Sequence, residues 1–282
     1  MISKKTSEKI AFAMMSAATV VVVTPVILIV AYILINGLPA MSWEFISEMP
    51  RRGMKDGGIF PAIYGTILLI IGTAVVAIPL GVGAAIYLAE YAEEGRLTRA
   101  IRLAIVNLAG VPSVVYGLFG LGLFVIFLGM GSSVLAGSLT LAVLILPVII
   151  ASAEEAIRSV PQDFRHASLA LGATKWQTVR SHVLPNALPG IITGIVLGLG
   201  RAAGETAPIL FTAAAFFLPR LPSSPFDQVM ALPYHLFVIA TQVPGMPVEK
   251  QYGTALILLA IVLSAYGAAT AVRMRFAARK LW

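Results

Sequence analysis

The stretch LPGIITGIVLGLGRAAGETAPILFTAAAFF, residues 188 to 217, contains only two charged side chains, Arg201 and Glu205. A helix of this length would extend about 45 Å, which exceeds the hydrocarbon core of a bilayer, about 30 Å thick. An arginine in the middle of a membrane helix costs roughly 2.5–3.5 kcal/mol to insert. We therefore expect a membrane span whose charged pair lies on a path for ions or polar substrates.

The composition of the whole chain agrees with a membrane protein and excludes several other classes. Of its 282 residues, 59% are hydrophobic and only 12% are charged, and there is no cysteine. The three histidines do not have the spacing of metal ligands, and we find no glycine-rich phosphate loop. Any ATP that the protein uses must therefore be hydrolysed by another chain. The formal net charge of +7 could suggest nucleic acid, but the basic residues cluster between apolar runs, which indicates membrane topology instead.

Six apolar runs are long enough to cross a bilayer, so we predict an all-α integral membrane protein with six transmembrane helices. The first run has no charged residue and is longer than a cleaved signal peptide, which predicts an anchor that is retained. The expected spans are residues 10–35, 63–88, 103–128, 133–152, 188–217 and 253–272.

The distribution of Lys and Arg predicts the orientation of these spans. Segments 1–9, 89–102, 153–187 and 273–282 hold 3, 3, 4 and 4 basic residues, or 14, whereas the segments on the opposite side hold 5. Cytoplasmic loops carry the excess of positive residues. We therefore expect a multi-pass protein of the cell membrane with both termini in the cytoplasm.

In the longest expected cytoplasmic segment, residues 153–187, the local sequence pattern predicts two helices joined by a turn. An amphipathic helix is expected over Asp163–Leu171, Gly172 is a plausible helix stop, and Thr174 with Gln177 matches a capping box that starts a second helix. Such a helix–turn–helix would present Ala167, Ser168, Gly172 and Trp176. The local pattern alone is equally compatible with a docking loop and with an amphipathic connector on the lipid surface, anchored by Trp176.

This segment resembles the EAA loop of ABC importer permeases, which docks into a cleft of the ATPase subunit. Gly172, Leu184 and Pro185 match at full spacing, and Ala167 and Ser168 match the small-residue pair. Two residues depart from the pattern, since His166 replaces the usual Glu and His182 replaces the usual Ile. The resemblance implies that His166, Ala167, Ser168, Gly172, Thr174, Trp176, Leu184 and Pro185 couple the chain to ATPase subunits. It also implies that the ATP is bound by those subunits and that this chain binds no cofactor or metal.

The segment from Arg201 to Pro208 is similar to the hallmark of phosphate importer permeases of the PstA type, and residues 210–213 and 231–233 also fit. The resemblance implies a type I ABC importer permease fold, with five core helices and an N-terminal helix. Residues 1–58 would form the anchor and an external loop, and residues 59–276 the permease domain. Arg201, Glu205 and Thr206 would line the substrate pathway. The implied partners are ATPase subunits, a homologous permease subunit in a heterodimer, an external phosphate-binding protein and membrane lipid.

Other interpretations remain open from the residues themselves. Arg201 and Glu205 are four residues apart and could pair only to lower each other's insertion cost. The substrate could be another oxyanion, such as sulfate or molybdate, or the chain could be an ion-driven secondary transporter. A lipid head-group enzyme would need a cluster of acids, and the nearest candidate is Glu90, Glu93 and Glu94. We interpret those glutamates as a solvated helix end.

Overall fold

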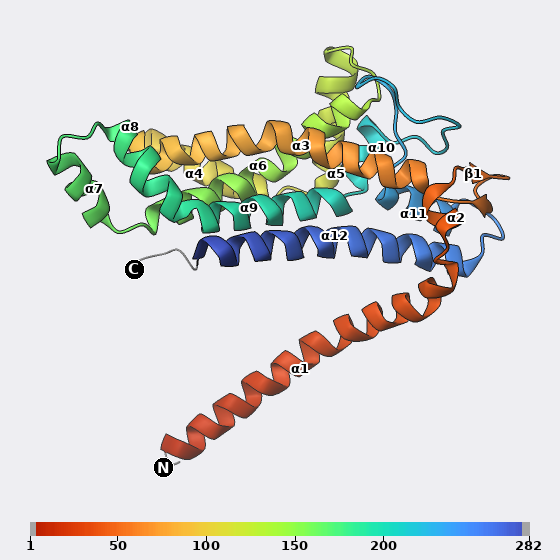
Figure 1. Ribbon diagram of the computed structural model, residues 1–282, viewed down its shortest axis with the longest axis horizontal. Helices are drawn as coiled ribbons and strands as arrows, with labels where there is room; N and C mark the ends of the chain where they lie inside the picture. Colours follow the sequence, from red (N-terminus) through yellow and green to blue (C-terminus); the bar gives the residue numbers. More distant parts are fainter. Residues whose placement is uncertain (1–3, 278–282) are drawn as a thin grey trace.

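The computed structural model describes residues 4–277, and most of them lie in helices that run along one bundle (Figure 1). Arg279 and Lys280, which contributed to the expected cytoplasmic charge, lie outside the described residues. The long helices are α1 (Lys4–Gly37), α3 (Phe60–Ile86), α6 (Val134–Arg158), α9 (Leu184–Gly204) and α12 (Val248–Ala277).

Shorter elements connect and extend these helices. At one end of the bundle lie η1 (Leu38–Ala40), α2 (Trp43–Ser47), the hairpin of β1 (Pro50–Arg51) and β2 (Asp56–Gly57), and α11 (Leu232–Thr241). The remaining elements are the π-helical turns η2 (Tyr87–Tyr91), η3 (Leu121–Phe127) and η4 (Val179–Val183), and the helices α4 (Arg96–Ala109), α5 (Ser113–Gly120), α7 (Gln162–Ala170), α8 (Lys175–Thr178) and α10 (Ala207–Thr212).

Helix α6 forms the centre of the bundle, and 61% of its most apolar 18-residue stretch is buried. Its first turn is fixed by Ser133, whose side chain accepts a hydrogen bond from the N–H of Ala136 at 3.2 Å. Helix α9 approaches α6 closely because Gly194 faces Ser152; a Cβ on Gly194 would lie 2.4 Å from the Cβ of Ser152. Small residues that let backbones approach are a main source of helix association in membranes.

The expected single span over residues 103–128 is wrong in detail. Helices α4 and α5 meet at a bend of 102°, and only the pair taken together could serve as a sixth span among the described residues. Pro112 disfavours helical backbone at the preceding residue and Gly110 ends α4, so the chain turns between them. The hydroxyl of Tyr116 donates to the carbonyl of Leu108 at 2.8 Å and holds the bend.

The expected span over residues 188–217 is also interrupted. Helix α9 ends at Gly204, the backbone of Glu205 is extended, and α10 begins at Ala207. Pro208 explains the break, because a proline ring clashes with the carbonyl four residues earlier, which here belongs to Gly204. Residues 213–217 are not helical.

Helix α9 begins earlier than expected, because α8, η4 and α9 follow one another without a break from Lys175 to Gly204. The π turn of η4 ends at Val183, two residues before Pro185. A π turn widens the helix there, which reduces the clash between the proline ring and the preceding turn. The second helix of the expected cytoplasmic loop is therefore the start of a membrane-spanning helix.

Helix α1 diverges from the rest of the bundle (Figure 1), and none of its most apolar 18 residues is buried. The C-terminal end of α1 contacts the N-terminal end of α12, where the rings of Tyr32 and Tyr252 pack edge to face with centroids 5.4 Å apart. The described ends of the chain and α7 lie at the same end of the bundle, opposite α2 and α11 (Figure 1). This arrangement agrees with an even number of crossings.

Candidate functional site

Arg201 and Glu205 lie together at the break between α9 and α10. Arg201 is in the last turn of α9, where a cation interacts favourably with the helix dipole, and Glu205 follows the last helical residue. The Nε of Arg201 donates to Oε1 of Glu205 at 3.2 Å. The two residues therefore pair as the sequence suggested, although Glu205 has already left the helix.

The surroundings of the two side chains differ. Glu205 is 16% exposed and lines a cavity of only about 10 Å³, between Thr66 of α3 and Pro233 of α11, which has room for about one water molecule. The side chain of Arg201 is 37% exposed. Thr206 is half-buried and its side chain does not cap α10. An ion could therefore reach Arg201 more easily than Glu205 in this conformation.

The loop between α6 and α9 forms the predicted helix–turn–helix. Helix α7 covers Gln162–Ala170, and Gly172 has a φ of +83°, which favours glycine and stops the helix. The capping box is present: Thr174 Oγ1 accepts from the N–H of Gln177 at 3.3 Å, and Gln177 Oε1 accepts from the N–H of Thr174 at 2.7 Å. The local pattern predicted these features correctly.

The residues of this loop do not all face outward. His166, Ala167, Gly172, Thr174 and Trp176 are exposed. Ser168 is buried, and its hydroxyl lies 2.9 Å from that of Thr178, so it joins α7 to α8 instead of presenting itself to a partner. Leu184 is half-buried, and Pro185 is exposed.

A buried ion pair holds α7 against η2, and the sequence did not reveal it. Arg165 Nη2 and Glu90 Oε1 are 2.6 Å apart, with the side chains 11% and 7% exposed. The guanidinium also donates to the carbonyls of Val160 at 2.7 Å and Ile157 at 2.9 Å. The interpretation of Glu90 as part of a solvated helix end is therefore wrong.

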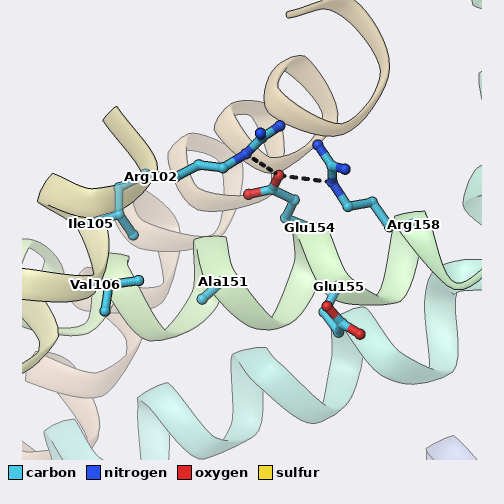
Figure 2. A pocket seen from close by; sticks show the side chains of 7 residues that line it. All are labelled: Arg102, Ile105, Val106, Ala151, Glu154, Glu155 and Arg158. Carbon is cyan, nitrogen blue, oxygen red and sulfur yellow. Dashed lines mark hydrogen bonds and ion pairs between the residues drawn. The ribbon is translucent and has the colours of Figure 1, made fainter. Parts of the chain in front are cut away.

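A second ion-pair cluster joins α4 to α6 (Figure 2). Oε1 of Glu154 accepts from Nε of Arg102 at 2.8 Å and from Nε of Arg158 at 3.0 Å. Both arginines also bond Glu94, and these hydrogen bonds hold the pKa of Glu94 below its usual range. The cluster borders a cavity of about 310 Å³, which Glu155 also lines, with its carboxylate turned away from the two arginines (Figure 2). These acids are occupied by arginines, which does not suit a head-group enzyme.

Among residues 4–277 no group of three or more His, Cys, Asp or Glu is placed to hold a metal ion. The arrangement thus combines a charged pair at a broken helix inside the bundle with a structured loop at one end. These features are typical of membrane-embedded transport subunits.

The family follows from comparison with known proteins. Residues 77–277 match the family of binding-protein-dependent transport system inner membrane components, and the chain belongs to this family. It is 34% identical over 275 residues to the probable ABC transporter permease protein YqgI of Bacillus subtilis, covering 93% of each chain. It is 36% identical to the phosphate transport system permease protein PstA 1 of Mycobacterium tuberculosis, covering 77% of this chain and 71% of that protein. The resemblance to PstA-type permeases is confirmed.

Solved structures confirm the fold class. A bacterial ABC transporter involved in the import of the acidic polysaccharide alginate aligns with a TM-score of 0.65 at 14% identity, over 94% of this chain and 96% of that chain. The MetNI methionine ABC transporter in an inward-facing form aligns with a TM-score of 0.62 at 17% identity, over 77% and 97%. The chain is therefore a multi-pass membrane protein with the fold of a type I ABC importer permease.

Proposed function

We propose that this chain is the permease subunit of an ATP-driven importer of inorganic phosphate. The observation that carries the proposal is the part-exposed guanidinium of Arg201 at the α9–α10 break, inside an apolar bundle. Arginine offers a planar fork of donors that suits phosphate oxygens. The relatives named as phosphate permeases support the same substrate.

Glu205 would distinguish between oxyanions. Phosphate near neutral pH retains a proton, since the second ionisation of a phosphate ester is near pH 6 and that of free phosphate is somewhat higher. A carboxylate can accept a hydrogen bond from this P–OH group, whereas sulfate has no proton and would be repelled. Because Arg201 and Glu205 together carry no net charge, a second basic group from a partner permease would complete the site.

The proposed complex contains two ATPase subunits that bind and hydrolyse the ATP, a homologous permease that makes a heterodimer, and an external phosphate-binding protein. Residues 59–276 would form the permease domain and residues 1–58 the anchor with its external loop. The unburied face of α1 supports contact with lipid or with the second permease. Closure of the ATPases on ATP would pull on the segment from Asp163 to Pro185 and rock the spans between inward-open and outward-open states.

The proposed orientation places both termini and α7 in the cytoplasm. The chain has no native cysteine, so single cysteines at Lys55 and at Leu171 can be labelled without background. A membrane-impermeant maleimide added to intact cells should label the cysteine at Lys55 and spare the one at Leu171. Labelling of both from the same side would contradict the six-span orientation.

The substrate role of Arg201 is tested by uptake of phosphate in cells that lack other phosphate importers, normalised to the amount of assembled complex. Arg201→Lys keeps the charge but loses the fork, so we expect assembly with a large loss of uptake. Replacing both Arg201 and Glu205 by Leu removes two desolvation costs, and this variant should also assemble without transporting. Uptake at the wild-type level by the double variant would mean that the pair only neutralises itself.

The role of Glu205 needs a separate measurement. In a reconstituted complex, Glu205→Gln should reduce the preference for phosphate over sulfate, because an amide does not repel sulfate. An unchanged preference would reject this role while leaving that of Arg201 intact. A wild-type complex that prefers sulfate or molybdate would overturn phosphate as the substrate.

A further inference from the structure

The exposed side of α7 and α8 combines apolar and basic side chains. We call the exposed residues His166, Leu169, Leu171, Lys175 and Trp176 the α7–α8 surface. Leu171, at the C-terminal end of α7, is 90% exposed, and Trp176, in α8, is 52% exposed. Helix α7 and the turn that follows it lie at one end of the bundle (Figure 1). Large apolar side chains that extend into solvent on a rigid turn favour contact with a partner.

A cavity of about 360 Å³ lies beside this surface, between α7, α8 and the end of η2. Arg165, His166 and Lys175 line it together with Glu90. The pairing of Glu90 with Arg165 at 2.6 Å cancels those two charges. Lys175 therefore gives the cavity a positive charge, and the imidazole of His166 lines it as a polar group.

Lys175 is held at the cavity by an aromatic contact. Its Nζ lies 5.0 Å from the centroid of the Tyr91 ring, within the range of a cation–π interaction. The charge of the wider loop has the same sign. With Arg165 paired to Glu90, the segment between residues 161 and 183 retains one acidic residue, Asp163, and two basic residues, Lys175 and Arg180. Complementarity therefore favours an acidic partner surface over a basic one.

We infer that the ATPase subunit inserts an acidic side chain between His166 and Lys175 and covers Leu171 and Trp176 with apolar residues. The inference rests on the proposed function, because it takes an ATPase to be the partner. It goes further by assigning the polarity of the contact. His166 replaces the glutamate of the resembled loop and so removes a negative charge, while Lys175 supplies the positive charge on the permease side of the contact.

The test measures binding of the ATPase subunit that co-purifies with the wild-type chain to variants of the full permease in detergent. Lys175→Glu exchanges attraction for repulsion, and glutamate in the first turn of α8 is compatible with the helix. We expect at least tenfold weaker binding of the ATPase subunit at low salt for Lys175→Glu. His166→Glu should also weaken this binding. The difference should shrink toward 1 M salt, where the Debye length is about 3 Å. Arg96→Glu, which makes the same charge change in the first turn of α4, is the control and should bind as the wild type does.

The outcomes separate the inference from the proposed function. Binding of Lys175→Glu within twofold of wild type at low salt would overturn the acidic contact. If that variant instead changes only the partition onto vesicles with anionic lipid, the surface belongs to the membrane and the inference is also overturned. A complex that shows the expected charge dependence but does not take up phosphate would reject the substrate while leaving the contact in place. A wild-type chain that retains no ATPase would reject both.

Discussion

Arg165→Met should detach α7 from the bundle without unfolding the spans. The substitution leaves the Glu90 carboxylate buried without its cation, and the side chain of Glu90 is only 7% exposed. Removal of one partner from a buried pair costs about 3–5 kcal/mol. The carbonyls of Ile157 and Val160 lose their donors as well, so the upper part of this range is expected.

Hydrogen exchange of the α7 amides measures this loss directly. Because every 1.4 kcal/mol is a factor of ten, exchange over Gln162–Ala170 should accelerate by about 10² to 3 × 10³ if α7 opens locally. Arg165→Met combined with Glu90→Leu should recover much of the protection, since no charge remains buried alone. Amides in the middle of α6 should be unaffected in both variants.

The exposed pair of Arg51 and Glu48 provides a matched control. Its side chains are 65% and 37% exposed at a separation of 2.8 Å, and such surface pairs contribute about 0–1 kcal/mol. Arg51→Met should therefore change exchange near residue 51 by less than about tenfold. If Arg165→Met leaves α7 exchange within threefold of wild type, the pair is not what holds α7, and the reasoning from its burial fails.

Gly172→Val should cost about 1–2 kcal/mol through backbone strain alone, because φ is +83° and no atom lies within 4 Å of the added Cβ. Gly172→Asn tolerates this φ and should retain ATPase binding, so equal loss by both variants would contradict the strain argument. Gly194→Val should destabilise the bundle by about 1–3 kcal/mol in thermal unfolding in detergent, since its Cβ would collide with Ser152. The same change at Gly83, where nothing lies within 4 Å, should be close to neutral. Hydrogen bonds from the N–H and O–H groups of Ser223 and from the N–H of Ser224 lower the pKa of Asp227. The contribution of Asp227 to the stability of its loop is therefore present above the unfolded pKa near 3.8 and is lost as the pH falls through the lower folded pKa. Proteolysis of the loop at residues 222–228 should thus increase at low pH in wild type, and Asp227→Asn should remove that dependence.

Local features of this chain were predictable from the sequence because their causes lie within a few residues. Thr174 and Gln177 are three apart, and each bonds the other's backbone N–H. Gly172 follows an amphipathic segment and has the expected positive φ. In both cases the partners are fixed by the chain itself, so no tertiary contact is needed to predict them.

The breaks inside the apolar runs were harder to predict, although their signals are local. Hydropathy averages over a long window, so it treats residues 103–128 as one span despite Gly110 and Pro112. Pro208 likewise ends α9 four residues earlier, inside a run that remains apolar. The composition defines what enters the membrane, whereas the individual prolines and glycines define where a helix ends.

The ion pairs that join different helices could not be predicted, because their partners are distant in sequence. Glu90 and Arg165 are 75 residues apart, and Arg102 and Glu154 are 52 apart. No periodicity relates such positions, and a glutamate near a helix end in water has the same local sequence as one that is buried. Only the packing of α7 and α4 against the bundle distinguishes the two cases.

The contrast between Arg165 and Arg201 is the strongest structural argument for the proposed role of Arg201 in binding substrate. A guanidinium has five N–H donors. Arg165 uses its Nε, Nη1 and Nη2 on Glu90 and on backbone carbonyls, and its side chain is 11% exposed. Arg201 makes one hydrogen bond to the described residues, through Nε, and is 37% exposed. Its two Nη groups keep the donors that a tetrahedral oxyanion requires, so Arg165 serves structure while Arg201 remains available for binding.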